Sequence, residues 1–227
     1  MQFHLPKPLH GWREFAGEVG IIVIGVLIAL GAQQLVENIH SLSEVKQTRT
    51  ALDAELAYNL AAFDGRMRME QCASNRLSEF VLILDREAHG RVALRHNFEA
   101  PLTVNLQFAV WDAASGEARS LIPLQAKLEY AQLYDILRHY DRYREGEKDD
   151  WAQLEDLDLS KQLSAQQVEQ ANATIKRLRR RDKLLPAYAS FIRRSAEPLD
   201  IRPESDIDAP ARALVDKNRA TFCSPLI

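Results

Sequence analysis

The chain has 227 residues, of which 46% are hydrophobic and 27% are charged, and its formal net charge is -3. This is the composition of an ordinary globular protein, with enough residues for one hydrophobic core and too few for two domains of comfortable size. The small net charge argues against a nucleic-acid-binding protein and against an acidic interaction tail.

An uncharged stretch near the amino terminus is the most specific feature of the sequence. Residues 19–36 read VGIIVIGVLIALGAQQLV and lie between Glu18 and Glu37. As a helix they would be roughly 27 Å long, close to the ~30 Å hydrocarbon thickness of a bilayer. The sequence therefore predicts a short leader (residues 1–18), a transmembrane helix (19–36) and one domain beyond it (37–227).

Two other interpretations of this stretch stay open. The core helix of a soluble protein would be expected to carry a polar stripe, which residues 19–32 lack. A cleavable signal peptide would use the apolar residues 19–28 and the small-x-small sequence at residues 29–31. The leader is long for a signal peptide and contains two glutamates, and the helical pattern continues past the cut, so we favour the uncleaved membrane helix.

The charges that flank the apolar stretch bear on its orientation. Lys7 and Arg13 precede it, and Lys46 and Arg49 follow it, so the count of basic residues on the two sides is a tie. The closeness of Arg13 to the apolar stretch and the free α-amino group favour a cytoplasmic amino terminus. In addition, long downstream domains are translocated with little regard to their charge. Residues 37–227 are then expected outside the cytoplasm.

The chain contains two cysteines, Cys72 and Cys223. An even count in an exported domain is compatible with a disulfide, which would close a loop of about 150 residues and attach the tail to an early helix. The alternative is two unrelated, reduced cysteines in a cytoplasmic domain. No CxxC sequence and no nearby pair of histidines accompanies them, so we expect no metal site there.

Helical periodicity continues beyond the apolar stretch. Apolar residues recur at steps of three, four or seven, and no proline interrupts them before Pro101. The pattern predicts a long helix over residues 14–85, with a break near residues 41–43 or near Gly65, because an unbroken helix of that length is unusual. The first of these apolar positions are Leu35, Ile39, Leu42, Val45, Leu52, Leu56, Leu60, Phe63 and Met67.

Two further helices are expected in the middle of the chain. One covers residues 104–115 and ends at Gly116, which is a suitable residue after a helix terminus. The other begins at Pro123 and continues to Glu145, where Gly146 is expected to stop it.

The carboxyl-terminal third completes a helical bundle. Ser164 and Gln167 form a capping box for a helix that extends to residue 196, in which Pro186 predicts a kink or break. Residues 211–227 are expected to return to the bundle. The predicted fold class is therefore mainly α, with one amino-terminal transmembrane helix continuing into a long helix that packs with a soluble helical bundle.

Gly25 and Ala29 are the candidate helix-helix contact. They form a small-xxx-small pair, which would let two membrane helices approach closely enough for backbone contact. The alternative is that small residues are simply common in membrane helices.

Three clusters of side chains are interpreted as structural. The basic cluster is expected to be a solvated helix face rather than a contact with anionic lipid or an acidic partner. The tyrosines are expected to pack on a neighbouring helix rather than line a ligand groove, and the carboxylates around Trp151 to form a solvated turn. The clusters are Lys176, Arg177, Arg179, Arg180, Arg181 and Lys183; Tyr130, Tyr134, Tyr140 and Tyr143; and Glu145, Glu147, Asp149, Asp150, Glu155, Asp156 and Asp158.

Signatures of catalysis are missing from the sequence. It contains no HExxH, no GxSxG, no phosphate-binding loop and no dinucleotide fingerprint, and its six histidines are scattered. We therefore expect a protein that is not an enzyme and that holds neither a cofactor nor a metal.

The amino-terminal segment resembles the opening of an uncharacterised family of bacterial single-pass membrane proteins. The resemblance rests on HGWREF (residues 10–15), EVG (18–20) and VIGVLIALGAQ (23–33), and continues more weakly through Trp111 and Gly116. It implies a membrane-anchored helical domain and no assigned biochemical activity.

One function and one alternative are expected. The first is a membrane-anchored interaction or scaffold protein, whose partners are the lipid bilayer and a second copy or another membrane protein, with no nucleic acid. The alternative is a sensor-like helical bundle that binds a ligand outside the cytoplasm and acts through a partner. In both cases we expect a single-pass protein of the bacterial inner membrane, with its amino terminus in the cytoplasm and residues 37–227 in the periplasm.

Overall fold

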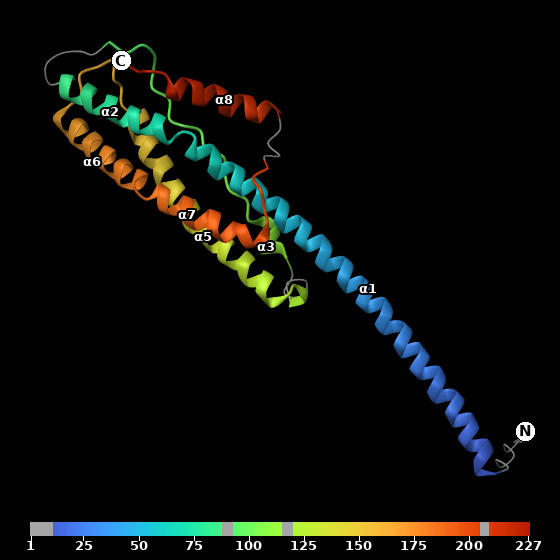
Figure 1. Ribbon diagram of the computed structural model, residues 1–227. Coiled ribbons are helices and arrows are strands. Elements are labelled where there is room, and N and C mark those ends of the chain that lie inside the picture. Colours follow the sequence, from blue (N-terminus) through green and yellow to red (C-terminus); the bar gives the residue numbers. More distant parts are fainter. Residues whose placement is uncertain (1–10, 88–92, 115–119, 205–208) are drawn as a thin grey trace, which may run out of the picture. The chain divides into compact units, whose positions relative to one another are not determined.

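The computed structural model describes residues 11–87, 93–114, 120–204 and 209–227, which form helices and connecting segments without a strand (Figure 1). The expected mainly α fold class is confirmed. In chain order the elements are α1 (Trp12–Met67), α2 (Glu70–Glu87), α3 (Ala109–Ala113), α5 (Leu124–Glu155), α6 (Ala165–Asp182), α7 (Leu185–Ala196), the 3-10 turn η1 (Glu197–Leu199) and α8 (Ala209–Cys223).

The chain divides into two compact units, residues 1–48 and residues 49–227. In the first unit, the apolar part of α1 is exposed: 74% of the surface of Ile21 and 62% of that of Leu27 is accessible. Burial of apolar surface is worth about 25 cal/mol per Å², so a helix of this kind is unfavourable in water. Among the described residues one helix is long and apolar enough to cross a membrane, which is compatible with single-pass anchoring.

The predicted break near Gly65 is present, because α1 ends two residues after it and α2 begins at Glu70. The helix continues through residues 41–43, the other position considered for a break. Between the two helices the backbone N–H of Met69 donates to the carbonyl oxygen of Arg66 at 3.0 Å. The side chain of Met69 is buried, so the turn is fixed by a tertiary contact as well as by its own hydrogen bond.

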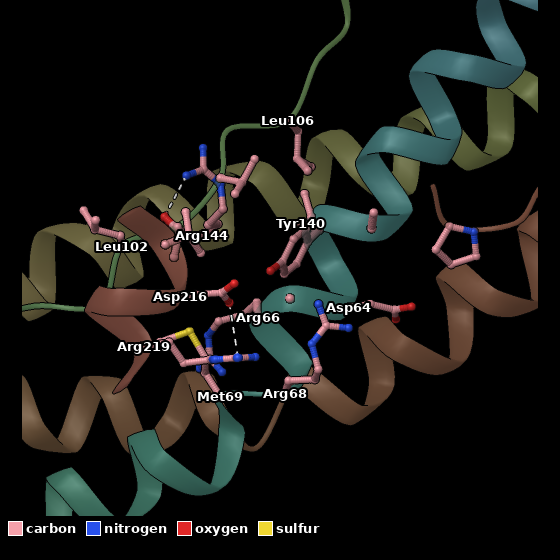
Figure 2. Close-up of a pocket in the computed structure, with 17 residues that line it drawn as sticks. Asp64, Arg66, Arg68, Met69, Leu102, Leu106, Tyr140, Arg144, Asp216 and Arg219 are labelled. Carbon is pink, nitrogen blue, oxygen red and sulfur yellow. Dashed lines mark hydrogen bonds and ion pairs between the residues drawn. The ribbon is translucent and has the colours of Figure 1, made fainter. Parts of the chain in front are cut away.

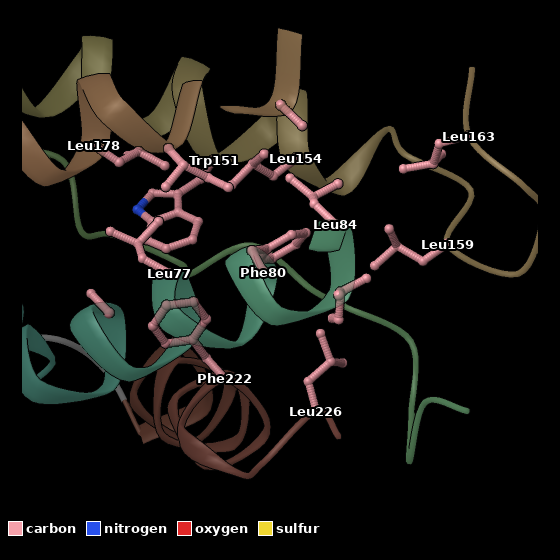
Figure 3. Packing of buried hydrophobic residues seen from close by; sticks show 14 of the residues in the cluster. Leu77, Phe80, Leu84, Trp151, Leu154, Leu159, Leu163, Leu178, Phe222 and Leu226 are labelled. Carbon is pink, nitrogen blue, oxygen red and sulfur yellow. The ribbon is translucent and has the colours of Figure 1, made fainter. Parts of the chain in front are cut away.

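The second unit is a bundle with its own hydrophobic core. Helix α5 packs against α6 and α7, while α2 packs against α6 and α8. Figure 3 shows Leu77 and Phe80 of α2 facing Trp151 and Leu154 of α5, with Phe222 of α8 closing the cluster. The rings of Trp151 and Phe222 meet edge to face with centroids 5.3 Å apart, a favourable aromatic arrangement.

Helix α5 continues past Gly146, so the predicted stop at this glycine is wrong. The next turns bury Glu147, Trp151 and Leu154, and this burial outweighs the lower helix propensity of one glycine. The glycine serves a different purpose. A Cβ at this position would lie 2.5 Å from a guanidinium nitrogen of Arg181, so a side chain here would displace that arginine.

The capping box and the break at Pro186 are confirmed. The backbone N–H of Gln167 donates to the Ser164 hydroxyl at 3.2 Å, and the Gln167 side chain accepts from the Ser164 N–H at 2.8 Å. Helix α6 ends at residue 182 and α7 starts at Leu185, so Pro186 lies in the first turn of the new helix, where a proline is tolerated.

Residues 93–108 have no regular secondary structure, so the helix predicted over residues 104–115 is wrong except for the short α3. Gly116, its predicted end, lies outside the described residues. The side chains of two buried asparagines bond backbone groups of this irregular segment. Asn59 accepts from the N–H of Gln107 and donates to its carbonyl, both at 2.7 Å, and Asn218 accepts from Leu102 N–H at 2.7 Å and donates to Ala100 C=O at 3.0 Å.

The carboxyl-terminal residues return to the bundle as predicted. Phe222 and Leu226 are buried, and Arg76 of α2 donates to the carbonyl oxygens of Phe222 and Ser224 at 2.7 and 2.6 Å. The sequence left the pairing of the cysteines open; in the structure Cys72 and Cys223 form a disulfide with a Cα–Cα distance of 4.9 Å. The tail is therefore attached to α2 by covalent, polar and apolar contacts.

Candidate functional site

A buried ion pair joins α1, α5 and α6. The guanidinium of Arg66 donates through Nε to the two carboxylate oxygens of Glu147 at 3.1 and 3.0 Å, and through Nη2 to Asp182 at 3.0 Å. A further contact from Nη2 to Glu147 is closer still. The side chains of Arg66 and Glu147 are each only 4% exposed. Such a pair depends on its geometry, because removing both charges from water is costly unless each is well bonded.

The prediction of a solvated turn around Trp151 is wrong for Glu147 and Asp150, although the other five carboxylates of the cluster are exposed; residues 145–155 are part of helix α5. Both Glu147 and Asp150 are buried on the inner side of α5, together with the Trp151 ring. Asp150 accepts from Nε of Arg177 at 2.7 Å and from Nε of Arg181 at 3.1 Å. Acidic residues on α5 are thus matched by arginines on α1 and α6.

The basic cluster is only partly a solvated face. Arg177 and Arg181 bind Asp150 and fix α6 to α5, although the Arg177 side chain is still 45% exposed; Arg179 and Arg180 are also exposed. The prediction of a wholly solvated face is therefore wrong for two of its arginines.

Burial and pairing determine the charge states in this network. Burial alone would lower the pKa of Arg66, but its acidic partners Glu147 and Asp182 contribute to a net rise in the pKa, so this guanidinium stays charged. Burial raises the pKa of Asp182, and the neighbouring Arg66 opposes that rise.

The four tyrosines of α5 are buried and pack against neighbouring elements, as predicted. Tyr134 donates its hydroxyl to Glu55 at 2.7 Å, and Tyr130 donates to Asp53. The rings of Tyr140 and Tyr143 are stacked, with centroids 5.8 Å apart. Burial raises the pKa of all four phenols, to about 12 for Tyr130, so they stay protonated at neutral pH.

One of these tyrosines also borders a pocket of about 490 Å³ (Figure 2). The pocket lies between the end of α1, the irregular segment near residues 102–106, the middle of α5 and the last helix, α8. Its volume falls in the range of small-molecule sites. The residues used below are Arg66, Arg68, Tyr140, Arg144, Asp216 and Arg219.

One buried polar group at this pocket has unused hydrogen-bonding capacity. Nη1 of Arg66 is buried and has no hydrogen-bond partner among the described atoms. Tyr140, of which only 1% is exposed, also borders the pocket. Buried donors are nearly always satisfied, so Nη1 of Arg66 calls for a water molecule or a ligand atom.

A second arginine in the wall of the pocket, Arg144, is fully engaged in hydrogen bonds. Arg144 donates to Asp141 at 3.1 and 2.9 Å, to Thr103 at 3.2 Å and to Glu145 at 2.5 Å. It therefore holds the segment around residue 103 against α5 and leaves the pocket open.

The remaining candidates from the sequence lie apart from this pocket. Gly25 and Ala29 are in the first unit, where a Cβ added at Gly25 would meet nothing within 4 Å, so their role as a contact stays a prediction. Cys72 and Cys223 do not line the pocket, but their disulfide attaches the end of α8, whose Asp216 and Arg219 form one wall.

A heptad-like pattern in α5 could have revealed the buried charges. One row of buried positions on this helix follows steps of four and three, and two residues in that row are charged. A charged residue on an otherwise apolar stripe indicates a buried partner. The positions are Leu133, Leu137, Tyr140, Arg144, Glu147, Trp151 and Leu154.

Groups of histidine, cysteine and acidic side chains able to hold a metal ion do not occur in the part of the chain that the structure describes. Comparison with known proteins finds no matching family, no matching curated protein and no matching solved structure. The argument about function therefore depends on the geometry of this chain alone.

Proposed function

We propose that this chain is a membrane-anchored helical interaction or scaffold protein of the bacterial inner membrane. One contrast supports the proposal: residues 49–227 bury a core of their own, whereas residues 19–36 leave large apolar side chains exposed. A stretch with eleven valines, isoleucines and leucines is more stable in lipid than in water. The bundle is then held at a membrane surface, which raises its effective concentration toward partners in the same membrane.

The disulfide supports placement of the bundle outside the cytoplasm. Disulfides persist in oxidising compartments such as the periplasm and are rare in the cytosol. The bond between Cys72 and Cys223 lies in the second unit. The leader, residues 1–18, is then cytoplasmic.

The ion pairs formed by the buried carboxylates favour a binding or structural role over catalysis. Glu147 and Asp150 are each paired with arginines, so neither is free to exchange a proton with a substrate. We propose that partners of the bundle supply any chemistry.

Replacing Ile24 and Leu27 with arginine is expected to release the protein from membranes. Each arginine near the centre of a membrane helix costs about 2.5–3.5 kcal/mol, which together offsets the apolar gain of the segment. The measurement is resistance of the membrane-bound protein to carbonate extraction. The matched control is the double change Ile39→Arg and Leu42→Arg, which adds the same charge to the same helix beyond residue 36 and should keep the protein bound. If both variants stayed in the membrane equally well, the proposal that residues 19–36 anchor the protein would be contradicted.

The second candidate function is a sensor-like bundle that binds a ligand outside the cytoplasm and acts through a partner. The pocket beside Tyr140 favours it, because the pocket combines a suitable volume with a lining residue, Arg66, whose buried Nη1 lacks a partner. A ligand that binds only the folded chain would raise its stability in proportion to the logarithm of its concentration.

A further inference from the structure

We propose that the pocket between α1, α5 and α8 binds a small organic anion, in which a carboxylate or phosphate group is attached to an apolar body. This inference rests on the ligand-binding candidate and does not depend on the membrane anchor. All the residues that carry it belong to the second unit, residues 49–227.

A buried donor defines the anion end of the site. Nη1 of Arg66 lacks a protein partner, and Arg66 and Tyr140 both border the pocket. Figure 2 shows Tyr140 beside Arg66. An oxygen of an anion can accept from the guanidinium and from the phenol hydroxyl, and the charge-assisted bond to the guanidinium is the stronger of the two.

The guanidinium of Arg66 is held in place before a ligand arrives. Glu147 and Asp182 occupy its Nε and Nη2, which leaves Nη1 as the free donor. A donor fixed in this way loses little conformational entropy on binding, so it contributes more to affinity than a flexible side chain.

The lining as a whole carries more positive than negative groups. Four arginines border the pocket, against two aspartates. Arg219 already contacts Asp216 at 3.2 Å, and Arg144 is engaged with the bundle, so Arg68 is the exposed cation left to attract a ligand. Arg68 and the unpaired Nη1 of Arg66 are therefore the groups at the pocket that favour an anion over a cation or a neutral molecule.

Apolar side chains supply the rest of the wall. They come from the break after α1, from the irregular segment and from α8, and they would cover a hydrocarbon or aromatic group. An inorganic ion would leave this surface and most of the volume unused. The apolar lining residues are Met69, Leu102, Val104, Leu106 and Val215.

The test is calorimetric titration of the full chain in nanodiscs of phosphatidylcholine, with phenyl phosphate as the probe. We expect saturable binding with one molecule per chain, and binding at least about tenfold weaker for phenol, which lacks the anion, and for inorganic phosphate, which lacks the apolar body. No binding of phenyl phosphate at millimolar concentration, or equal binding of phenol, would overturn the assignment.

Variants separate the site from the general stability of the bundle. Tyr140→Phe keeps the ring packing and removes the phenol hydroxyl of a pocket-lining residue, and Arg68→Gln removes the exposed cation. Each should weaken phenyl phosphate binding about tenfold or more with little loss of thermal stability. Tyr134→Phe is the matched control: it removes the hydrogen bond to Glu55, away from the pocket, and should lower stability while keeping affinity. Unchanged affinity in both pocket variants would also overturn the proposal.

The same anion could belong to a free solute or to a lipid head group. Nanodiscs that include phosphatidic acid should weaken phenyl phosphate binding if a lipid phosphate reaches the pocket, and should leave it unchanged if the ligand is a solute. Both results keep the anion assignment. Failure of this proposal can be distinguished from failure of the ligand-binding function. If phenol alone bound, the pocket would still be a ligand site but would have no preference for anions. Carbonate extraction tests the membrane anchor independently.

Discussion

Replacing Glu147 with alanine is expected to lower the free energy of unfolding of the bundle by about 3–5 kcal/mol, enough to prevent folding in a marginally stable domain. The change leaves the Arg66 guanidinium buried with only Asp182 as a partner. Urea unfolding of the full chain in detergent, followed by circular dichroism, measures the loss.

Two further variants serve as controls for the effect of Glu147→Ala. Glu145→Ala removes a neighbouring carboxylate that is 48% exposed, from an arginine that keeps its bonds to Asp141 and Thr103, so its cost should stay below about 1 kcal/mol. The double change Arg66→Met and Glu147→Leu removes both charges and should recover most of the stability lost in Glu147→Ala. Similar losses for Glu145→Ala and Glu147→Ala would contradict the importance of this buried pair.

Replacing Cys223 with serine is expected to destabilise the bundle by about 2–5 kcal/mol. The bond links residues 151 positions apart, and the chain-entropy argument gives a loop of that size on the order of 5 kcal/mol as an upper value. Without it, the contacts of Phe222 and Leu226 with the core must hold α8 alone. We expect loosening of the tail before global unfolding, detected as faster amide hydrogen exchange in α8.

Electrophoresis without reductant provides the direct measurement of the bond. The unreduced chain should migrate faster than the reduced chain, and Cys223→Ser should migrate like the reduced chain under both conditions. The double variant Cys72→Ser and Cys223→Ser should match the single variant in stability. If Cys223→Ser were as stable as the unreduced protein and migrated as fast in the gel, a structural disulfide would be excluded.

Long apolar periodicity predicted the main helices because it depends only on neighbours along the chain. The repeats through Leu52, Leu56 and Phe63 place α1 correctly, and the capping box at Ser164 marks the start of α6. The failures come from tertiary contacts. Gly146 does not stop α5 because the next two turns bury side chains in the core. Residues 104–108 are not helical, and the side chain of Asn59 bonds the backbone of Gln107 there.

The candidate site could not be assembled from the sequence. Its residues come from segments that lie as far apart in the sequence as Arg66 and Arg219. No local sequence pattern indicates that α8 packs near the end of α1 to form the pocket. The charged positions on the apolar stripe of α5, Arg144 and Glu147, were the available signal. The sequence prediction places Glu147 in a solvated acidic segment, because several carboxylates surround it along the chain.

The most direct test of the account is the reaction of introduced cysteines with a membrane-impermeant maleimide in bacterial spheroplasts. The native cysteines are joined in a disulfide, so the unaltered chain should react little. Lys161→Cys adds a thiol at a position in the bundle that is 79% exposed, and Lys7→Cys adds one to the leader. We expect Lys161→Cys to react in intact spheroplasts and Lys7→Cys to react only after lysis. The reverse pattern, or loss of the leader from the mature chain, would contradict an anchored bundle outside the cytoplasm.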